Sequence, residues 1–162
     1  MERIINSRIT NGILNYHQSA ICFGERRMIC MAIWQFDFHA VKHGSTADNI
    51  MLWNIPFEDI NHICFLKQER SWMDDTIQYG NLEEDCIEIS LSNGLVESIF
   101  IRIDVRDINK EKISNICSYL KEINADILYG NRVFSANEKD LEEVIVKSNG
   151  YRFFQTDADI KI

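Results

Sequence analysis

The chain has 162 residues, of which 46% are hydrophobic and 26% charged, with one proline and seven glycines. This is the composition of a folded chain of one-domain size, and it excludes a disordered or low-complexity protein. The 17 basic and 25 acidic residues give a net charge of −8, and an acidic surface repels nucleic acid and anionic membranes. We therefore expect neither nucleic acid nor a membrane as a partner.

The first thirty residues differ in charge from the rest of the chain. They carry four arginines and two glutamates, whereas residues 31–162 carry thirteen basic and twenty-three acidic residues. We expect residues 1–30 to be a leader that is dispensable or lies upstream of the true start, and residues 31–162 to form one α+β domain. The chain shows no secretory-signal pattern and no apolar run of membrane-spanning length, so we expect a cytoplasmic protein.

The first predicted elements are a strand and a helix. Residues 31–39 alternate as a strand does, with Trp34, Phe36 and Phe38 on one face. Pro56 suits a first helical turn, and the apolar residues after it recur at the helical interval. This pattern predicts a helix over about 56–69.

A β-hairpin is expected in the middle of the chain. Residues 86–92 alternate between apolar and polar side chains and are followed by Asn93-Gly94. That dipeptide favours the positive φ angles of a two-residue hairpin turn. The return strand is expected to run to about Val105, with its isoleucines inward and with Arg102 and Asp104 outward.

A second helix is predicted over about 110–124, where the apolar residues keep the helical interval and Asn109 can cap the first turn. Beyond it, Gly130-Asn131 separates two short apolar runs and predicts another tight turn.

The last predicted elements are a helix and a strand. Ser135 and Glu138 have the spacing of a capping box, opening a helix that ends near Gly150, and residues 151–154 are expected to form a last strand. From residue 86 onward the order ββαββαβ predicts an α+β fold. It would be a single two-layer domain with an antiparallel sheet and helices packed on one face.

The acidic residues are concentrated in one stretch. No Lys or Arg occurs between Arg70 and Arg102, so this stretch should present a negative surface that attracts a basic protein. A solvated loop that aids solubility is the plainer interpretation of the same run. The residues expected to bind the partner are two aromatic anchors and the neighbouring carboxylates: Trp72, Asp74, Asp75, Tyr79, Glu83, Glu84 and Asp85.

No motif for a metal, a cofactor or a catalytic group emerges. His39 and His43 are four residues apart but flank a strand end, and the acidic run lacks the spacing of a calcium loop. The five cysteines include no CxxC pair, which favours reduced structural thiols. We therefore expect no cofactor, no metal site and no catalytic site.

Two alternatives to a protein-binding domain stay open. Arg102, Asp104 and Arg106 alternate along one strand and, with His39, are the best candidates for an enzyme with a scattered active site. An ion-pair ladder is the plainer interpretation of the same three residues. The second alternative is a domain that self-associates through exposed strand edges.

Three segments carry a resemblance to a known group of proteins: Trp34-Gln35-Phe36-Asp37-Phe38-His39, Ile101-Arg102-Ile103-Asp104-Val105-Arg106 and Ser148-Asn149-Gly150-Tyr151-Arg152-Phe153-Phe154. Together they resemble the small, acidic immunity proteins that bacteria encode beside toxins. The resemblance covers about residues 31–162 and assigns no functional residue. It implies a non-enzymatic inhibitor that binds and neutralises one basic cognate toxin in the cytoplasm of the producing cell.

Overall fold

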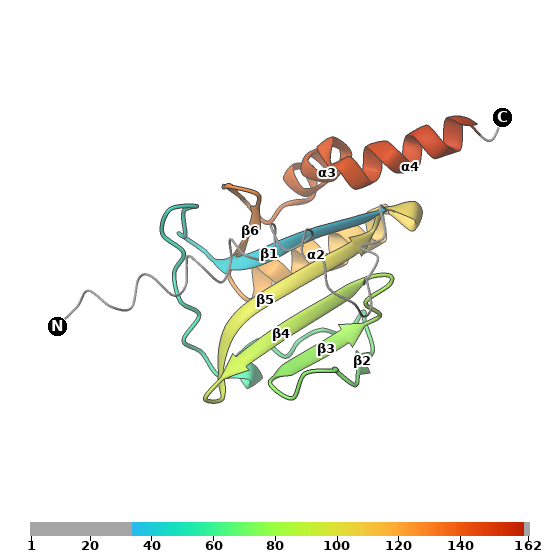
Figure 1. Ribbon diagram of the computed structural model, residues 1–162. Coiled ribbons are helices and arrows are strands. Elements are labelled where there is room, and N and C mark those ends of the chain that lie inside the picture. The colour runs from blue at the N-terminus through green and yellow to red at the C-terminus, as the bar shows by residue number, and fades with distance from the viewer. Residues whose placement is uncertain (1–33, 161–162) are drawn as a thin grey trace, which may run out of the picture. The chain divides into compact units, whose positions relative to one another are not determined.

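A computed structural model describes residues 34–160 of the chain (Figure 1). The predicted leader, residues 1–30, lies outside the described residues, as do the first three residues of the strand predicted over 31–39.

In the described part of the chain, seven strands form one sheet, in the order β2-β3-β4-β5-β1-β6-β7, and every neighbouring pair is antiparallel. The strands are β1 (Gln35–Lys42), β2 (Gln68–Glu69), β3 (Thr76–Gly80), β4 (Cys86–Ser92), β5 (Leu95–Asp104), β6 (Ala125–Tyr129) and β7 (Arg132–Phe134).

The helices are α2 (Lys110–Glu122), α3 (Glu138–Lys147) and α4 (Asn149–Ile160), with short 3-10 segments η1 (Phe57–Asp59) and η2 (Val105–Asp107). Figure 1 shows α2 behind the sheet, and α3 packs against α2. The predicted α+β class with an antiparallel sheet is therefore confirmed. Within residues 34–160, none of the helices combines the length and the apolar character needed to cross a bilayer.

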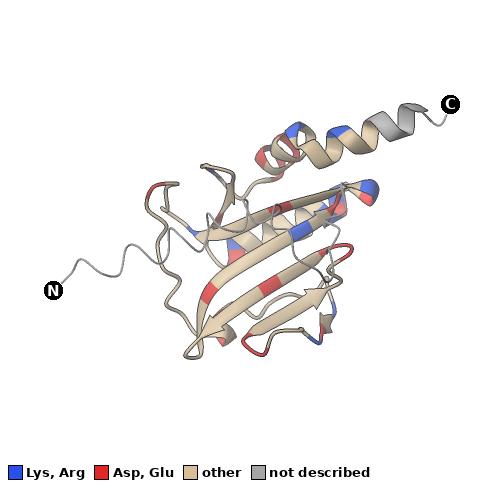
Figure 2. Cartoon of the chain, viewed as in Figure 1, with Lys and Arg blue, Asp and Glu red and all other residues tan. Residues whose placement is uncertain are grey.

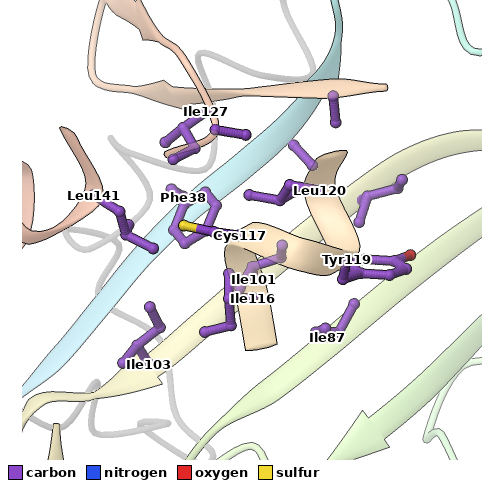
Figure 3. Close-up of a cluster of buried hydrophobic side chains, with 14 of the residues drawn as sticks. Phe38, Ile87, Ile101, Ile103, Ile116, Cys117, Tyr119, Leu120, Ile127 and Leu141 are labelled. Atoms are coloured by element: carbon purple, nitrogen blue, oxygen red, sulfur yellow. The ribbon is translucent and has the colours of Figure 1, made fainter. Parts of the chain in front are cut away.

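One face of the sheet carries the core. Phe38 of β1, Ile101 of β5 and Ile87 of β4 occupy matching register positions and are at most 2% exposed. Against them pack Ile116 and Leu120 from one stripe of α2 (Figure 3). The period of two along the strands and the helical period in α2 thus bury the same apolar layer.

The other face of the sheet is polar and is not covered by α2; we call it the open face. Its middle row runs across four strands through His39, Phe100, Glu88 and Gln78, which are register partners in turn. Asp37 and Arg102 form part of the adjacent row. The charged side chains of Asp37, Glu88 and Arg102 therefore lie on this one face of the sheet.

Two predicted turns are confirmed. Asn93 and Gly94 have φ angles of 53° and 78° and join β4 to β5. Gly130, at φ 60°, lies between β6 and β7. Arg102 and Asp104 lie on the strand face opposite the isoleucines between and before them, as predicted, but Asp104 is only 5% exposed.

The two predicted helix starts have different outcomes. Asn109 caps α2 as expected, its side chain accepting a hydrogen bond from the Lys112 amide. For α3 the cap predicted at Ser135 is wrong, because Asn137 accepts from the Asp140 amide at 2.9 Å and the helix begins at Glu138.

The helix predicted over 56–69 is wrong. Only Phe57–Asp59 form a short 3-10 turn, and residues 60–67 are irregular until β2 begins. Ile60 and Ile63 are nevertheless buried, so the apolar spacing reflects burial of a loop and not of a helix. Tertiary contacts override the helical period here, since Asn61 accepts a hydrogen bond from the Tyr79 hydroxyl.

The last strand, predicted over 151–154, is also wrong, because these residues lie in α4. Tyr151 and Phe154 are three residues apart and both pack against the core, as one face of a helix does, while Phe153 is 57% exposed. Four aromatic-rich residues are too few to separate the strand period from the helical period. Gly150 lies inside this helix and does not end α3.

Candidate functional site

The acidic stretch divides into two loops at opposite ends of β3. Asp74 and Asp75 precede β3, in the loop of residues 70–75 that we call the Trp72 loop. Glu83, Glu84 and Asp85 follow it, in the loop of residues 81–85 that we call the 81–85 loop. Five strand residues separate them by roughly 17 Å, and Figure 2 shows the two acidic segments at the two ends of β3. The sequence run is thus two patches in space.

The Trp72 loop displays a large aromatic side chain on ordered backbone. Trp72 is 71% exposed. Around it, the Ser71 hydroxyl accepts a hydrogen bond from the Met73 amide at 3.1 Å, and the Asp75 carbonyl accepts one from the Leu91 amide at 2.8 Å. These bonds tie the backbone of the loop to β4, while the indole and the carboxylates of Asp74 and Asp75 are exposed.

Tyr79 does not belong to this surface, and its predicted role as an anchor needs correction. It is only 4% exposed and lies on the core face of β3. Its hydroxyl donates to Asn61 in the irregular 60–67 segment. Alternation along β3 placed its ring in the core, where no partner protein reaches it.

The 81–85 loop is tied to distant parts of the fold. The Leu82 carbonyl accepts hydrogen bonds from Gln35 Nε2 at 3.1 Å and from Arg102 Nη1 at 2.8 Å. The loop therefore reaches across the open face to β5 and β1.

The Asp85 carboxylate also attaches the 81–85 loop to the rest of the fold. One carboxylate oxygen accepts from the Asp104 amide at 2.8 Å, and the other lies 2.6 Å from Lys112 Nζ at the start of α2. Lys112 also pairs with Asp107. Burial would lower the pKa of Lys112, but its bonds to Asp107 and Asp85 outweigh burial and raise it. Asp85 thus holds the loop, which leaves Glu83 and Glu84 exposed to solvent.

Arg102 binds two acceptors of its own chain, the Asp37 carboxylate and the Leu82 carbonyl. Its Nε and Nη2 atoms bind the two carboxylate oxygens of Asp37 at 2.8 and 2.9 Å, and Nη1 binds the Leu82 carbonyl. Both side chains of the pair are less than a fifth exposed. The nearby carboxyl group of Glu88 has a raised pKa, caused first by its burial. All three guanidinium nitrogens of Arg102 thus donate to the chain's own acceptors, with three of the five N–H groups in use.

Asp104 and Arg106 form a second local pair. Arg106 Nε lies 3.0 Å from the Asp104 carboxylate, and its guanidinium carbon lies 4.5 Å from the centre of the Trp34 ring. Burial alone would raise the pKa of Asp104, but hydrogen bonds from Arg106 outweigh it and lower the pKa. Two side-by-side ion pairs therefore account for the three residues of the alternative active site.

The histidines and cysteines of residues 34–160 do not converge on one site. His43 Nδ1 lies 2.9 Å from Asp126 beyond the end of β1, while His39 lies on the open face with its ring against Phe100. Burial raises the pKa of Cys86 to about 12, which keeps this thiol protonated at neutral pH. Within residues 34–160, no three His, Cys, Asp or Glu side chains are placed to hold a metal ion.

A polar depression of about 470 Å³ opens beside the 81–85 loop. It brings together residues from β2, β3 and the loop, and its lining is Leu66, Glu69, Gln78, Gly80, Asn81, Glu84 and Asp85. Glu69, Gln78 and Asn81 were not predicted to lie together. The residue pattern predicts a helix over 56–69, whereas Gln68 and Glu69 form the strand β2 beside β3. Glu69 is the register partner of Gln78 across β2 and β3. Only a correct prediction of the short edge strand β2 would have indicated that these two residues are neighbours.

Comparison with known protein families, with curated proteins and with solved structures finds no match to this chain.

Proposed function

We propose that this chain is a non-enzymatic, cytoplasmic protein-binding domain that recognises a basic partner protein. The observation that supports it most directly is the Trp72 loop, where a 71% exposed indole stands beside Asp74 and Asp75 on hydrogen-bonded backbone. Exposed tryptophan is costly in water and is enriched among residues that dominate binding energy. Its ordered setting lowers the entropy lost on binding.

The charge of the surrounding surface favours a basic partner. Asp74, Asp75, Glu83 and Glu84 are exposed and make no ion pair within 4 Å among residues 34–160. Such a field speeds encounter with a positively charged surface and disfavours acidic ones. The plainer alternative, a solvated loop, does not explain why the largest exposed side chain in the stretch is a tryptophan.

A cognate toxin is the partner that fits this chemistry and the resemblance to immunity proteins. Many toxic nucleases are basic because they hold nucleic acid, and an acidic inhibitor can cover that surface. In this proposal the chain neutralises the toxin by binding alone, so it needs no cofactor and no catalytic residue.

The test is co-expression of the tagged chain with the products of the genes that neighbour its own, followed by association kinetics at increasing salt with any product that binds. We expect the association rate to fall steeply with salt while dissociation changes less, because screening weakens long-range steering. The charge variant carries Asp74→Asn, Asp75→Asn, Glu83→Gln and Glu84→Gln. Asp85 is kept because it holds the fold.

A control variant with the same change in net charge separates local from overall electrostatics. It neutralises four exposed carboxylates that lie outside the two loops: Asp48, Glu58, Glu111 and Glu142. We expect slower association only for the charge variant. Equal rates for the charge variant and the wild type at low salt, or equal slowing in both variants, would exclude the two acidic loops as the binding surface.

A further inference from the structure

We propose that Asn93, in the turn between β4 and β5, is a site of spontaneous deamidation, with the backbone nitrogen of Gly94 as the nucleophile. The inference does not depend on the proposed function, because it concerns the chemistry of the turn itself. Asparagine is among the thermolabile residues of proteins. Its reaction requires a side chain that can rotate, an accessible amide nitrogen on the next residue, and access of water.

The reaction is a ring closure followed by hydrolysis. The Gly94 amide gives its proton to hydroxide from the solvent, and its nitrogen attacks Asn93 Cγ. The new N–Cγ bond forms as the Cγ–Nδ2 bond breaks, and Nδ2 leaves as ammonia. Water then opens the succinimide ring. Cleavage at the side-chain carbonyl carbon leaves aspartate at position 93, and cleavage at the main-chain carbonyl carbon leaves isoaspartate.

The two groups that react are both accessible in the structure. Asn93 and Gly94 are exposed, at one end of the sheet (Figure 1). Neither the Asn93 side chain nor the Gly94 amide makes a hydrogen bond in the part of the chain that the structure describes. Apart from its chain neighbours, no heavy atom lies within 4 Å of the place that a Cβ of Gly94 would occupy. The absence of that Cβ leaves the peptide unit free to rotate towards Cγ.

A second Asn-Gly pair shows what the fold can protect. Asn149 is the first residue of α4, and Gly150 is buried. The Ser148 hydroxyl and carbonyl accept hydrogen bonds from the Tyr151 and Arg152 amides at 3.3 Å each, and these bonds hold the first turn of the helix. Ring closure at Asn149 would require that turn to unwind and Gly150 to become exposed. The same dipeptide therefore occurs once in an open setting and once in a protected one.

The products act on the end of the sheet that carries the Trp72 loop. Isoaspartate adds a methylene group to the main chain, so a two-residue turn no longer keeps Ser92 opposite Leu95. The Leu91 amide, the next along β4, donates to the Asp75 carbonyl of the Trp72 loop at 2.8 Å. Aspartate leaves the main chain intact and adds one negative charge. Isoaspartate alone should therefore disturb the backbone that supports the Trp72 loop.

The experiment incubates the full-length chain at mildly alkaline pH, well below its melting temperature, and follows each asparagine by peptide mass spectrometry. Deamidation is detected as the mass gained when an amide becomes a carboxylate, and chromatography separates isoaspartyl from aspartyl peptides. We expect Asn93 to react about tenfold faster than Asn149, equivalent to roughly 1.4 kcal/mol in activation free energy. In urea, where the fold is lost, the two rates should become similar.

Two controls assign the nucleophile. Asn131 lies in the turn between β6 and β7 and is also exposed, but Arg132 follows it, and that side chain hinders attack by the amide nitrogen. We expect Asn131 to react more slowly than Asn93. Gly94→Ala places a methyl group beside the nucleophile and should slow the reaction of Asn93 about tenfold, with the rate at Asn149 unchanged. Urea titration checks that this variant is folded.

Three results would overturn the inference. Equal rates at Asn93 and Asn149 in the folded chain would mean that the reaction proceeds through global unfolding. An unchanged rate at Asn93 in Gly94→Ala would exclude the Gly94 nitrogen as the nucleophile. Reaction at Asn93 in urea but not in the folded chain would show that the turn protects its asparagine.

Discussion

The two loops at the ends of β3 have similar acidity and opposite relations to the fold. The Trp72 loop is ordered by bonds to its own neighbours and to β4, and its carboxylates face solvent. The 81–85 loop is bound to β1, β5 and α2 through the Asp85 carboxylate and the Leu82 carbonyl. The number of acidic residues in a sequence segment therefore does not show which carboxylates are exposed and available to bind a partner.

This difference predicts that the two loops respond differently to substitution. Removing a partner of the 81–85 loop should cost stability, because half-buried charges are left without a counter-charge. Removing an exposed side chain of the Trp72 loop should cost binding and little stability. Four substitutions, taken from the largest expected effect on stability to the smallest, test that contrast.

Arg102→Met should have the largest effect on stability. It leaves Asp37, whose side chain is only 18% exposed, without its charged donor, and it removes one of the two side-chain hydrogen bonds to the Leu82 carbonyl. Breaking such a pair by removing one partner costs about 3 kcal/mol, measured as a change in the free energy of unfolding by urea titration. The control is Lys67→Met, which breaks the exposed pair with Glu69 and should cost less than about 0.5 kcal/mol.

The double variant Arg102→Met with Asp37→Leu isolates the cause of that loss. Removing both charges leaves no unpaired carboxylate, so most of the stability should return. If the double variant is no more stable than Arg102→Met, the cost comes from the lost hydrogen bond to the Leu82 carbonyl and from the 81–85 loop, not from the unpaired charge of Asp37.

Gly80→Ala should rank second, at about 2 kcal/mol, and Gly94→Ala is its matched control. Both glycines have positive φ, at 75° and 78°, but an added Cβ at Gly80 meets the Asp85 carbonyl at 2.2 Å whereas at Gly94 nothing lies within 4 Å. The control should therefore show only the cost of the left-handed backbone, about 1 kcal/mol. Equal losses in thermal or urea unfolding would mean that the 81–85 loop shifts freely away from β3.

The sequence predicted the local parts of the fold well. The β4–β5 hairpin and α2 carry long periodic patterns with a turn or a cap to mark their ends, at Asn93-Gly94 and at Asn109. The predictions for residues 60–67 and 151–154 were wrong because the apolar pattern of each segment is too short to distinguish between backbone conformations. Tertiary contacts decide which conformation forms. In those segments, burial of Ile60 in the core and packing of Phe154 against it decide the backbone conformation.

The candidate site was predictable only in part. Charge and aromatic content pointed to Trp72, Asp74, Asp75, Glu83 and Glu84, which the structure leaves exposed. They could not separate these residues from Tyr79 and Asp85, because that distinction depends on strand pairing and on Lys112, twenty-seven positions further along the chain. The depression beside the 81–85 loop could not be predicted from the sequence for the same reason, because it forms only when β2 pairs with β3.

Asp104→Asn should have a smaller effect, about 1 kcal/mol at neutral pH, and one that depends on pH. Hydrogen bonds from Arg106 lower the pKa of Asp104 in the folded chain, so its stabilising contribution is present above the unfolded value, near 4. That contribution is lost as the pH falls through the lowered folded pKa. Urea unfolding of the wild type and the variant should therefore give free energies that converge as the pH falls below the lowered folded pKa. A constant difference from neutral to acid pH would contradict the assignment.

Trp72→Ala should have the smallest effect on stability and a large effect on association. The indole is 71% exposed, so its removal takes little apolar area out of the fold, and the free energy of unfolding should change by less than about 0.5 kcal/mol. If the Trp72 loop binds the partner, the same change should raise the dissociation rate, because anchors act mainly after encounter. Phe153→Ala, which removes another exposed aromatic side chain from α4, is the control and should leave partner kinetics unchanged. Kinetics of the two variants against the co-expressed partner decide the matter: similar dissociation rates for Trp72→Ala and the wild type would place the binding surface away from this loop.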